Sequence, residues 1–149
     1  MQIIHSNSRQ ETVGFAEKFA QKLPKGAVIA FLGDLGAGKT AFVTGLAKGL
    51  SIDCDVSSPT FAICNQYIGD ENTLYHFDMY RVDGWDDLYS TGFFDCLDSD
   101  SYIAIEWSEN VYGALPDDAI IIDIKKSLKM SESLKFIKKV KWINASVVR

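Results

Sequence analysis

Apolar residues in the first part of the chain recur at helical spacing, and polar residues mark where that pattern starts and stops. Ser8 and Glu11 have the spacing of a capping box, in which each side chain satisfies a backbone N–H at the start of a helix. The segment 24–26 contains Pro and Gly, which end helices. A helix is therefore predicted between them, with one apolar face made of Val13, Ala16, Phe19, Ala20 and Leu23.

The next apolar segment has a different pattern. Residues 27–32 form an unbroken apolar run, which is typical of a strand covered on both faces and hence of a central parallel strand. Glycine-rich residues 33–40 follow this run. A second helix is predicted after them, because its apolar residues share one side: Phe42, Val43, Leu46, Ala47 and Leu50.

The rest of the chain alternates short apolar runs with turn signals. An antiparallel pair of strands is predicted on either side of a turn at 69–72, and an acidic, weakly helical segment broken by Gly92 comes next. Three more strands are predicted after it. The expected fold class is α/β: a P-loop NTPase-type three-layer fold with a mixed, partly parallel sheet flanked by helices. Its later strands are expected at 61–67, 73–80, 102–105, 120–124 and 134–142.

Length and composition narrow the class of protein. With 149 residues, the chain is expected to form a single domain over 1–149. It is 47% hydrophobic and 23% charged, as average globular proteins are, and no apolar run approaches the roughly 20 residues that span a bilayer. Three widely spaced cysteines suggest reduced thiols. We expect a cytoplasmic protein with no membrane partner.

Charge is distributed unevenly along the chain. Residues 125–149 carry eight Lys or Arg and one Glu, a net charge of +7, so the preceding 124 residues carry −12. An acidic body disfavours strong autonomous binding to nucleic acid. The basic stretch at 125–149 is expected either to touch a phosphate backbone or an acidic partner, or to be a solvated strand and tail.

Residues 33–40 match the phosphate-binding motif G-x-x-x-x-G-K-[ST] in full, between a predicted buried strand and a predicted helix. Glycines allow backbone N–H groups to crowd around phosphate oxygens, at the positive end of the helix dipole. Lys39 is expected to reach the β- and γ-phosphates, and the Thr40 hydroxyl to ligate Mg²⁺. Nucleotide contacts are expected from Asp34, Leu35, Gly36, Ala37, Gly38, Lys39, Thr40 and Ala41.

A phosphate-binding loop also needs an acidic partner for its metal ion. Glu106 ends an apolar strand, and Asp78 lies in an alternating segment, so both are candidate catalytic acids and Mg²⁺ ligands. A strand-end carboxylate without such a loop would be read as a solvated rim acid. The chain lacks the [NT]-K-x-D motif of guanine-specific proteins, which favours adenine as the base.

Four sequence blocks together resemble the bacterial TsaE (YjeE) family of P-loop ATPases, which act in the synthesis of tRNA threonylcarbamoyladenosine. Residues 33–40 resemble the family's form of the phosphate-binding loop, and 58–61 (S-P-T-F) resemble its next block. Residues 75–81 resemble its H-x-D-x-Y-R block, and 105–109 its I-E-W-x-E block. Residues 115–118 also fit the linker that follows, so the resemblance covers about 8–124 in the right order.

The resemblance implies roles for particular residues. It implies ATP and Mg²⁺ as ligands, with Asp78 and Glu106 as the metal-binding and water-positioning acids. Thr60 resembles a switch-type threonine that senses the γ-phosphate, Trp107 is placed near the nucleotide, and Thr12 near the base. One departure is Ala41, where the family usually has a second threonine, so any contact from that hydroxyl is lost.

The resemblance also implies that the protein does not modify tRNA alone. It implies an ATPase that supports a partner complex of TsaB/TsaD-like proteins, which transfers the threonylcarbamoyl group to the adenosine at tRNA position 37. Contact with tRNA would then come only through that complex. No dedicated arginine finger is evident, and phosphoryl transfer without one is about 10³–10⁵-fold slower, so slow turnover by the isolated chain is expected.

Three other functions stay open from the residues alone. Many short P-loop proteins are small-molecule kinases, although an arginine-rich lid is not evident with only Arg9, Arg81 and Arg149 in the chain. A nucleotide-dependent binding switch with incidental hydrolysis is the second alternative. Direct tRNA binding by Lys138, Lys139 and Lys141 is a third hypothesis.

Overall fold

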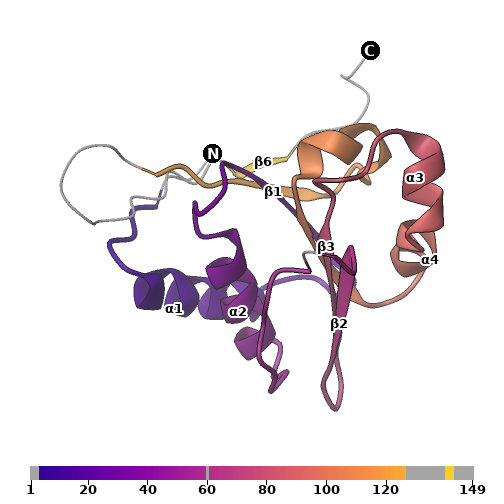
Figure 1. The fold of residues 1–149 in the computed structure, drawn as a ribbon. Coiled ribbons are helices and arrows are strands. Elements are labelled where there is room, and N and C mark those ends of the chain that lie inside the picture. The colour runs from indigo at the N-terminus through magenta and orange to yellow at the C-terminus, as the bar shows by residue number, and fades with distance from the viewer. Residues whose placement is uncertain (1–3, 60, 127–139, 143–149) are drawn as a thin grey trace.

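A computed structural model describes residues 4–59, 61–126 and the backbone of 140–142. Helices and strands alternate along most of this chain (Figure 1). In order they are α1 (Arg9–Ala20), β1 (Val28–Leu32), α2 (Lys39–Gly49), β2 (Cys64–Ile68), β3 (Thr73–Asp78), α3 (Trp85–Ser90), α4 (Phe93–Leu97), β4 (Tyr102–Glu106), η1 (Ser108–Ala114), β5 (Ile120–Asp123) and β6 (Val140–Trp142).

The strands form one six-stranded mixed sheet in the order β2-β3-β4-β1-β5-β6. Strand β1 pairs in parallel with β4 on one side and with β5 on the other, as the unbroken apolar run at 27–32 predicts. Strand β3 continues the parallel part beside β4, whereas β2 and β6 are antiparallel to their neighbours. The parallel strands β3, β4 and β1 therefore present their carboxyl ends at one edge, where ligands bind in open α/β sheets.

Helices cover both faces of the sheet, which confirms the expected three-layer α/β class (Figure 1). Alternate residues of β1 serve the two sides. Ile29 and Phe31 pack in the core that contains α1 and α2, whereas Val28 packs in the core that contains Leu88 of α3 and Phe93 of α4. Because β1 is covered on both faces, four of its five residues are buried.

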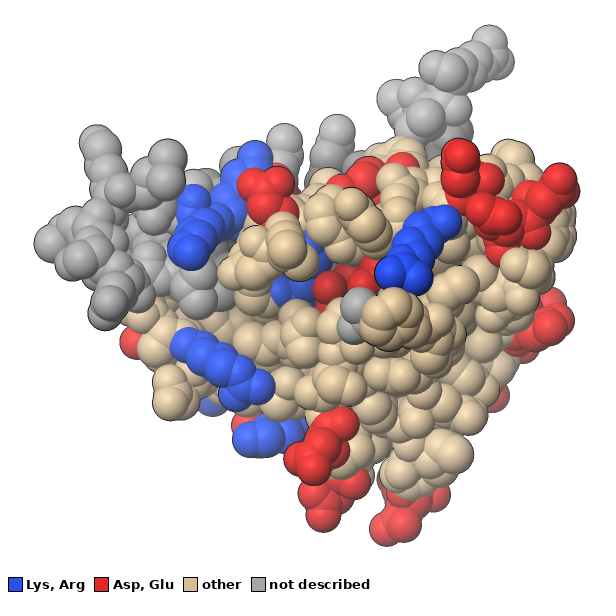
Figure 2. Space-filling view, in the orientation of Figure 1, with Lys and Arg blue, Asp and Glu red and all other residues tan. Residues whose placement is uncertain are grey.

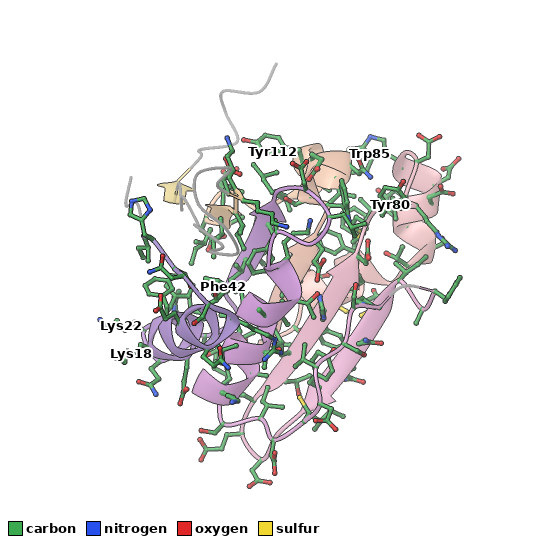
Figure 3. All side chains as sticks on the ribbon, turned by 60° about the vertical axis from the view of Figure 1, so that its left-hand side comes forward. Lys18, Lys22, Phe42, Tyr80, Trp85 and Tyr112 are labelled. Carbon is green, nitrogen blue, oxygen red and sulfur yellow. The ribbon has the colours of Figure 1, made fainter. Side chains whose placement is uncertain are left out.

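Helices α1 and α2 pack closely because glycine is present at two contact positions. A Cβ atom at Gly45 would lie 2.4 Å from the Val13 carbonyl oxygen, and one at Gly49 would lie 2.2 Å from that of Glu17. Phe42 of α2, labelled in Figure 3, lies on the same helix, and its ring contacts those of Phe15 and Phe19 in α1 and of Phe31 in β1. This packing fixes α2, and with it the loop at its N-terminus, against the sheet.

The start of α1 follows the predicted capping pattern. The Ser8 hydroxyl accepts a hydrogen bond from the Glu11 N–H at 3.1 Å, and the Glu11 carboxylate accepts one from the Asn7 N–H at 2.7 Å. The carboxylate thus reaches one residue further back than the usual capping box. The described part of the chain contains no helix that is long and apolar enough to cross a membrane.

Several predicted boundaries differ from the structure. The strand expected at 61–67 begins only at Cys64, because Ile63 has a left-handed backbone (φ 63°) and residues 61–63 form a turn. The strand expected at 73–80 ends at Asp78, whose carboxylate accepts from the Tyr80 N–H and forms a turn there. Gly92 (φ 77°) separates α3 from α4 as expected. Of the strand expected at 134–142, only 140–142 lie within the described residues.

Charged side chains are distributed unevenly over the described surface. Figure 2 shows Asp and Glu side chains over α3 and α4 and also at the lower edge of the view, whereas most Lys and Arg side chains lie on the side of α1. The acidic group around α3 and α4 comprises Asp83, Asp86, Asp87, Asp95 and Asp98. Most of the basic stretch at 125–149 lies outside the described residues.

Candidate active site

The loop between β1 and α2 is shaped by glycines in conformations that other residues rarely adopt. Gly33, Gly36 and Gly38 all have positive φ, at 130°, 74° and 107°. At Gly33 space is limiting as well, because a Cβ atom would lie 2.2 Å from the Ile124 carbonyl oxygen. The first N–H groups of α2 have no acceptor within the helix, so this loop offers several donors and the positive end of a dipole to an anion.

Lys39 is a buried cation that pairs with no anion among the described residues. The residue is 4% exposed, and its Nζ donates to the carbonyl oxygens of Gly33 and Asp34. No carboxylate among the described residues forms an ion pair with it. Its ammonium group lies 4.5 Å from the centre of the Trp107 ring. A buried positive charge held only by neutral groups fits a site for an anionic ligand such as phosphate.

Glu106 meets the loop from the end of β4. Its Oε1 accepts a hydrogen bond from the Thr40 hydroxyl at 3.1 Å and lies 2.8 Å from His76 Nε2. The residue is 4% exposed. Both hydrogen bonds use Oε1, so Oε2 has no partner among the residues that the structure describes. Oε2 and the Thr40 hydroxyl are hard oxygen donors of the kind that Mg²⁺ prefers.

Asp78 lies beside Glu106 at the end of the neighbouring strand. The two residues are register partners in the parallel pair β3–β4, as expected for acids at the carboxyl ends of adjacent strands. Asp78 Oδ1 accepts from the Tyr80 N–H at 3.0 Å, and its Oδ2 lies 3.5 Å from the Ser58 hydroxyl. The two carboxylates thus face the same region from neighbouring strands.

A cavity of about 320 Å³ lies between the loop and these two strand ends. A second space of about 460 Å³ adjoins it, lined in part by Ile63, Tyr80 and Arg81. These sizes fall within or near the range of small-molecule sites. The first cavity is lined by Arg9, Leu35, Gly36, Gly38, Lys39, Thr40, Ala41, Ser58, Asp78, Glu106 and Trp107.

Most of the residues expected at the site therefore line one cavity, but some do not. Asp34 contributes its carbonyl oxygen to Lys39 and to the Ala37 N–H, while the Ala37 side chain is buried in the core. Thr12 lies apart, in a small apolar pocket, with its hydroxyl donating to the Ser8 carbonyl. Thr60 lies outside the described residues, and its role stays a prediction.

Trp107 has a left-handed backbone (φ 56°), which is uncommon for a bulky residue. This conformation follows the end of β4 directly and begins the 3₁₀ helix η1, which the sequence pattern does not predict. The Ser108 hydroxyl donates to the Phe31 carbonyl at 2.8 Å and ties this turn to β1. The result is an indole ring beside Lys39, at the cavity wall.

Reasoning from sequence missed two residues at the site. Arg9, at the start of α1, lines the cavity, although it is distant in the sequence from the phosphate-binding motif at 33–40 and from both candidate acids. His76 is fully buried and contacts Glu106, although no role is expected for it. A signal for His76 exists in the sequence, because a residue two positions before Asp78 in a strand lies on the same face.

Comparisons with known proteins agree with these observations. The family described as "Threonylcarbamoyl adenosine biosynthesis protein TsaE" matches residues 6–134. A Treponema pallidum protein named tRNA threonylcarbamoyladenosine biosynthesis protein TsaE is 38% identical over 120 residues, covering 80% of this chain and 88% of the relative. A Rickettsia prowazekii protein of the same name is 37% identical, covering 80% and 83%. The crystal structure of Bacillus subtilis YdiB matches with a TM-score of 0.72 and 29% identity, covering 92% of this chain and 84% of that one. The chain belongs to the TsaE family.

Proposed function

We propose that this protein binds and hydrolyses ATP with Mg²⁺ in the cavity between the 33–40 loop and the ends of β3 and β4. The observation that carries the proposal is the 3.1 Å hydrogen bond from Thr40 to Glu106, beside the buried Lys39, which pairs with no carboxylate in the described part of the chain. This hydrogen bond brings together the Thr40 hydroxyl, which is expected to ligate a metal ion, and the Glu106 carboxylate, which is expected to ligate the same ion or to orient its water. A turn with a purely structural role and a surface lysine would explain neither this hydrogen bond nor the burial of Lys39.

The proposed roles follow from the contacts. Lys39 holds the β- and γ-phosphate oxygens, and Thr40 is a ligand of the metal. Asp78 and Glu106 share the remaining tasks, metal coordination and orientation of the attacking water. Bound Mg²⁺ would neutralise charge on the phosphates. We assign the nucleotide contacts otherwise to the loop residues 34–41, with Trp107 at the cavity wall, Thr60 as the γ-phosphate sensor and Thr12 near the adenine.

The relatives named above are tRNA threonylcarbamoyladenosine biosynthesis proteins. We infer that this chain, acting as a single domain in the cytoplasm, supports threonylcarbamoyl transfer to the adenosine at tRNA position 37 by a TsaB/TsaD-like partner complex. The described surface around α3 and α4 is acidic (Figure 2). Because an acidic surface repels nucleic acid, this agrees with contact to tRNA only through that complex.

The mouth of the cavity supports the idea of a protein partner. Leu35 is 87% exposed, Phe61 82% and Tyr80 63%, and all three lie close to the cavity or its neighbour. Large apolar side chains grouped at the rim of a site mark a surface for a protein. Docking there would cover the Ser58–Phe61 segment, so we propose that the partner completes the site and speeds hydrolysis.

Measuring ATP turnover with and without the partner complex tests this function. We expect slow release of phosphate from the isolated chain and faster release in the complex. The variant Leu35→Glu, which introduces a negative charge at the exposed tip of the loop, should lose that stimulation. Equal rates with and without the complex would contradict the proposal that docking completes the site.

Two variants separate hydrolysis from binding. Glu106→Gln should bind ATP while its turnover falls by about 100-fold or more, the usual contribution of a positioned base. Glu109→Gln, on the exposed surface of η1, is the matched control and should behave like the unmodified chain. Continued tRNA modification over many cycles with Glu106→Gln would favour a binding switch instead. A phosphorylated metabolite in place of free phosphate would favour a small-molecule kinase.

A further inference from the structure

A chain of buried polar groups extends from the active-site carboxylate to the segment that borders the cavity. His76 is 0% exposed, and its Nε2 lies 2.8 Å from Glu106 Oε1. On the other side of the ring, Nδ1 lies 3.4 Å from the Tyr67 hydroxyl. That hydroxyl donates to the Ser57 carbonyl oxygen at 2.9 Å. Three strand residues, on β2, β3 and β4, thus connect the cavity wall to Ser57.

The number of hydrogens that these buried groups can donate limits how their hydrogen bonds can be arranged. An ionised Glu106 carboxylate only accepts, so His76 Nε2 must carry the hydrogen, and Nδ1 of the neutral ring is then an acceptor. Tyr67 has one hydroxyl hydrogen for two acceptors, His76 Nδ1 and the Ser57 carbonyl. In the structure the shorter contact is to Ser57, whose own N–H also lies 3.3 Å from the hydroxyl. If Ser57 moves away, the hydrogen is free to turn to His76.

Ser57 is directly followed by a residue of the site. The Ser58 hydroxyl lies 3.5 Å from Asp78 Oδ2 and lines the cavity together with Glu106. The Asn65 side-chain amide donates to the Ser57 carbonyl at 3.1 Å and holds it on the same strand pair. Movement of the 57–58 segment would therefore change both the surroundings of Asp78 and the hydrogen bond on the far side of His76.

We propose that His76 is a positioning residue that orients Glu106, and that Tyr67 couples its hydrogen bonding to the Ser57–Ser58 segment. The inference rests on the proposed function, because it concerns the carboxylate assigned there to the metal ion and its water. Groups that hydrogen-bond a metal-binding or catalytic carboxylate fix its orientation, and their loss typically costs about 10–100-fold in metal affinity or activity.

Tyr67→Phe tests the coupling with the smallest change to the fold. It leaves His76 against Glu106 but removes the hydroxyl between His76 and Ser57. Tyr75→Phe is the matched control, since it removes a tyrosine hydroxyl from the same strand pair, one that accepts from Gln66 at 2.9 Å. We expect Tyr67→Phe to lower ATP turnover about 10-fold and to weaken the gain in affinity that Mg²⁺ gives to a non-hydrolysable ATP analogue. Affinity without Mg²⁺ should be unchanged.

Two substitutions of His76 separate its two contacts. The amide of His76→Gln extends to the position of Nε2 and can still donate to Glu106, whereas that of His76→Asn extends only to the position of Nδ1. We therefore expect higher turnover and stronger Mg²⁺ dependence in His76→Gln than in His76→Asn. A residue that only filled space would give the same result with both.

Ring ¹⁵N spectra supply a readout that is independent of turnover. The chain has two histidines, so the His76 signals are assigned by their loss in His76→Gln. Tyr67→Phe should shift the Nδ1 signal of His76, and Tyr75→Phe should not. The inference is overturned if the two tyrosine variants agree in Mg²⁺ dependence and in this spectrum while the unmodified chain binds Mg²⁺ and nucleotide. Failure of the unmodified chain to bind them would instead refute the proposed function.

Discussion

The Thr40 hydroxyl lies 3.1 Å from Oε1 of Glu106, although the two residues are 66 positions apart in the sequence. Thr40 belongs to the first turn of α2 and Glu106 to the last residue of β4. Both strands β1 and β4 run parallel and adjacent, so the loop after β1 and the end of β4 meet at the same edge of the sheet. This contact ties the anion-binding loop to the acid beside it.

Removing the Thr40 hydroxyl should therefore affect the metal more than the nucleotide. We expect Thr40→Ala to lose most of the affinity that Mg²⁺ adds to ATP binding, about 10-fold or more, because the proposed metal ligand is removed. Thr40→Ser keeps the hydroxyl and should restore it. Thr44→Ala removes a hydroxyl one turn later, which donates to the Thr40 carbonyl, and serves as the control. Calorimetric titration at several Mg²⁺ concentrations measures the effect.

Lys39→Ala should weaken ATP binding itself. Each charge-assisted hydrogen bond to phosphate contributes about 1.5–3 kcal/mol, and the desolvated position of Lys39 preserves that strength. The dissociation constant should rise about 10–100-fold for each bond lost. Lys48→Ala, at the exposed end of the same helix, should leave it unchanged. Undiminished affinity of Lys39→Ala in a titration calorimeter would contradict the assignment of the loop.

The contact between α1 and α2 gives a prediction for stability. Gly45→Ala places a Cβ atom 2.4 Å from the Val13 carbonyl and 2.5 Å from the Ala16 Cβ, so the helices must separate. We expect the free energy of unfolding to fall by about 1–3 kcal/mol. Gly14→Ala is the control, because nothing lies within 4 Å of its added Cβ. That variant should gain about 0.5–1 kcal/mol from its lower unfolded-state entropy. Denaturant titration measures the free energy of unfolding and distinguishes the expected decrease from the expected increase.

The Cys64 thiol should be unreactive in the folded protein. Burial, together with the neighbouring Cys96, raises the pKa of the Cys64 thiol to about 12. At pH 8 only about 10⁻⁴ of it would then be thiolate, the form that alkylating reagents attack. Iodoacetamide labelling followed by mass spectrometry should find Cys64 protected at pH 8 and modified in urea. Equal labelling rates in both conditions would contradict this prediction.

The same shift has a defined effect on stability. The folded state holds the Cys64 proton more tightly than the unfolded state does, in which the pKa is about 8.5. The contribution of this thiol to the free energy of unfolding is therefore complete below that pH and decreases as pH rises toward about 12. Cys64→Ser should show a weaker fall in stability over this window than the unmodified chain, when measured by denaturant titration.

Much of the fold follows from local patterns. The apolar run at 27–32 predicts a strand covered on both sides, and β1 is the buried parallel strand between β4 and β5. The motif at 33–40 predicts a loop opening into a helix, as the structure has it. Gly92 predicts the break between α3 and α4. These features depend on residues that are neighbours in the sequence, through backbone sterics and side-chain periodicity, so they can be predicted from local sequence patterns.

Other features depend on contacts that the linear order does not contain. The turn at 61–63 and the end of β3 at Asp78 arise where the strands part, with the Ile63 carbonyl bonded to the Asp78 N–H. The position of His76 between Glu106 and Tyr67 depends on the order of β2, β3 and β4. Alternation places His76 and Asp78 on one face of β3, but nothing local indicates which carboxylate or hydroxyl meets that face.

The amino-acid sequence by itself thus determined the anion-binding loop, the central parallel strand and the two acids at strand ends, because each is encoded within a few consecutive residues. Only the tertiary structure decided that Arg9 lines the cavity, that the Thr40 hydroxyl donates a hydrogen bond to Glu106, and that the buried His76 contacts the same carboxylate. The physical reason is that strand order sets which side chains, distant in the sequence, become neighbours. Burial then strengthens the few polar contacts that these side chains make.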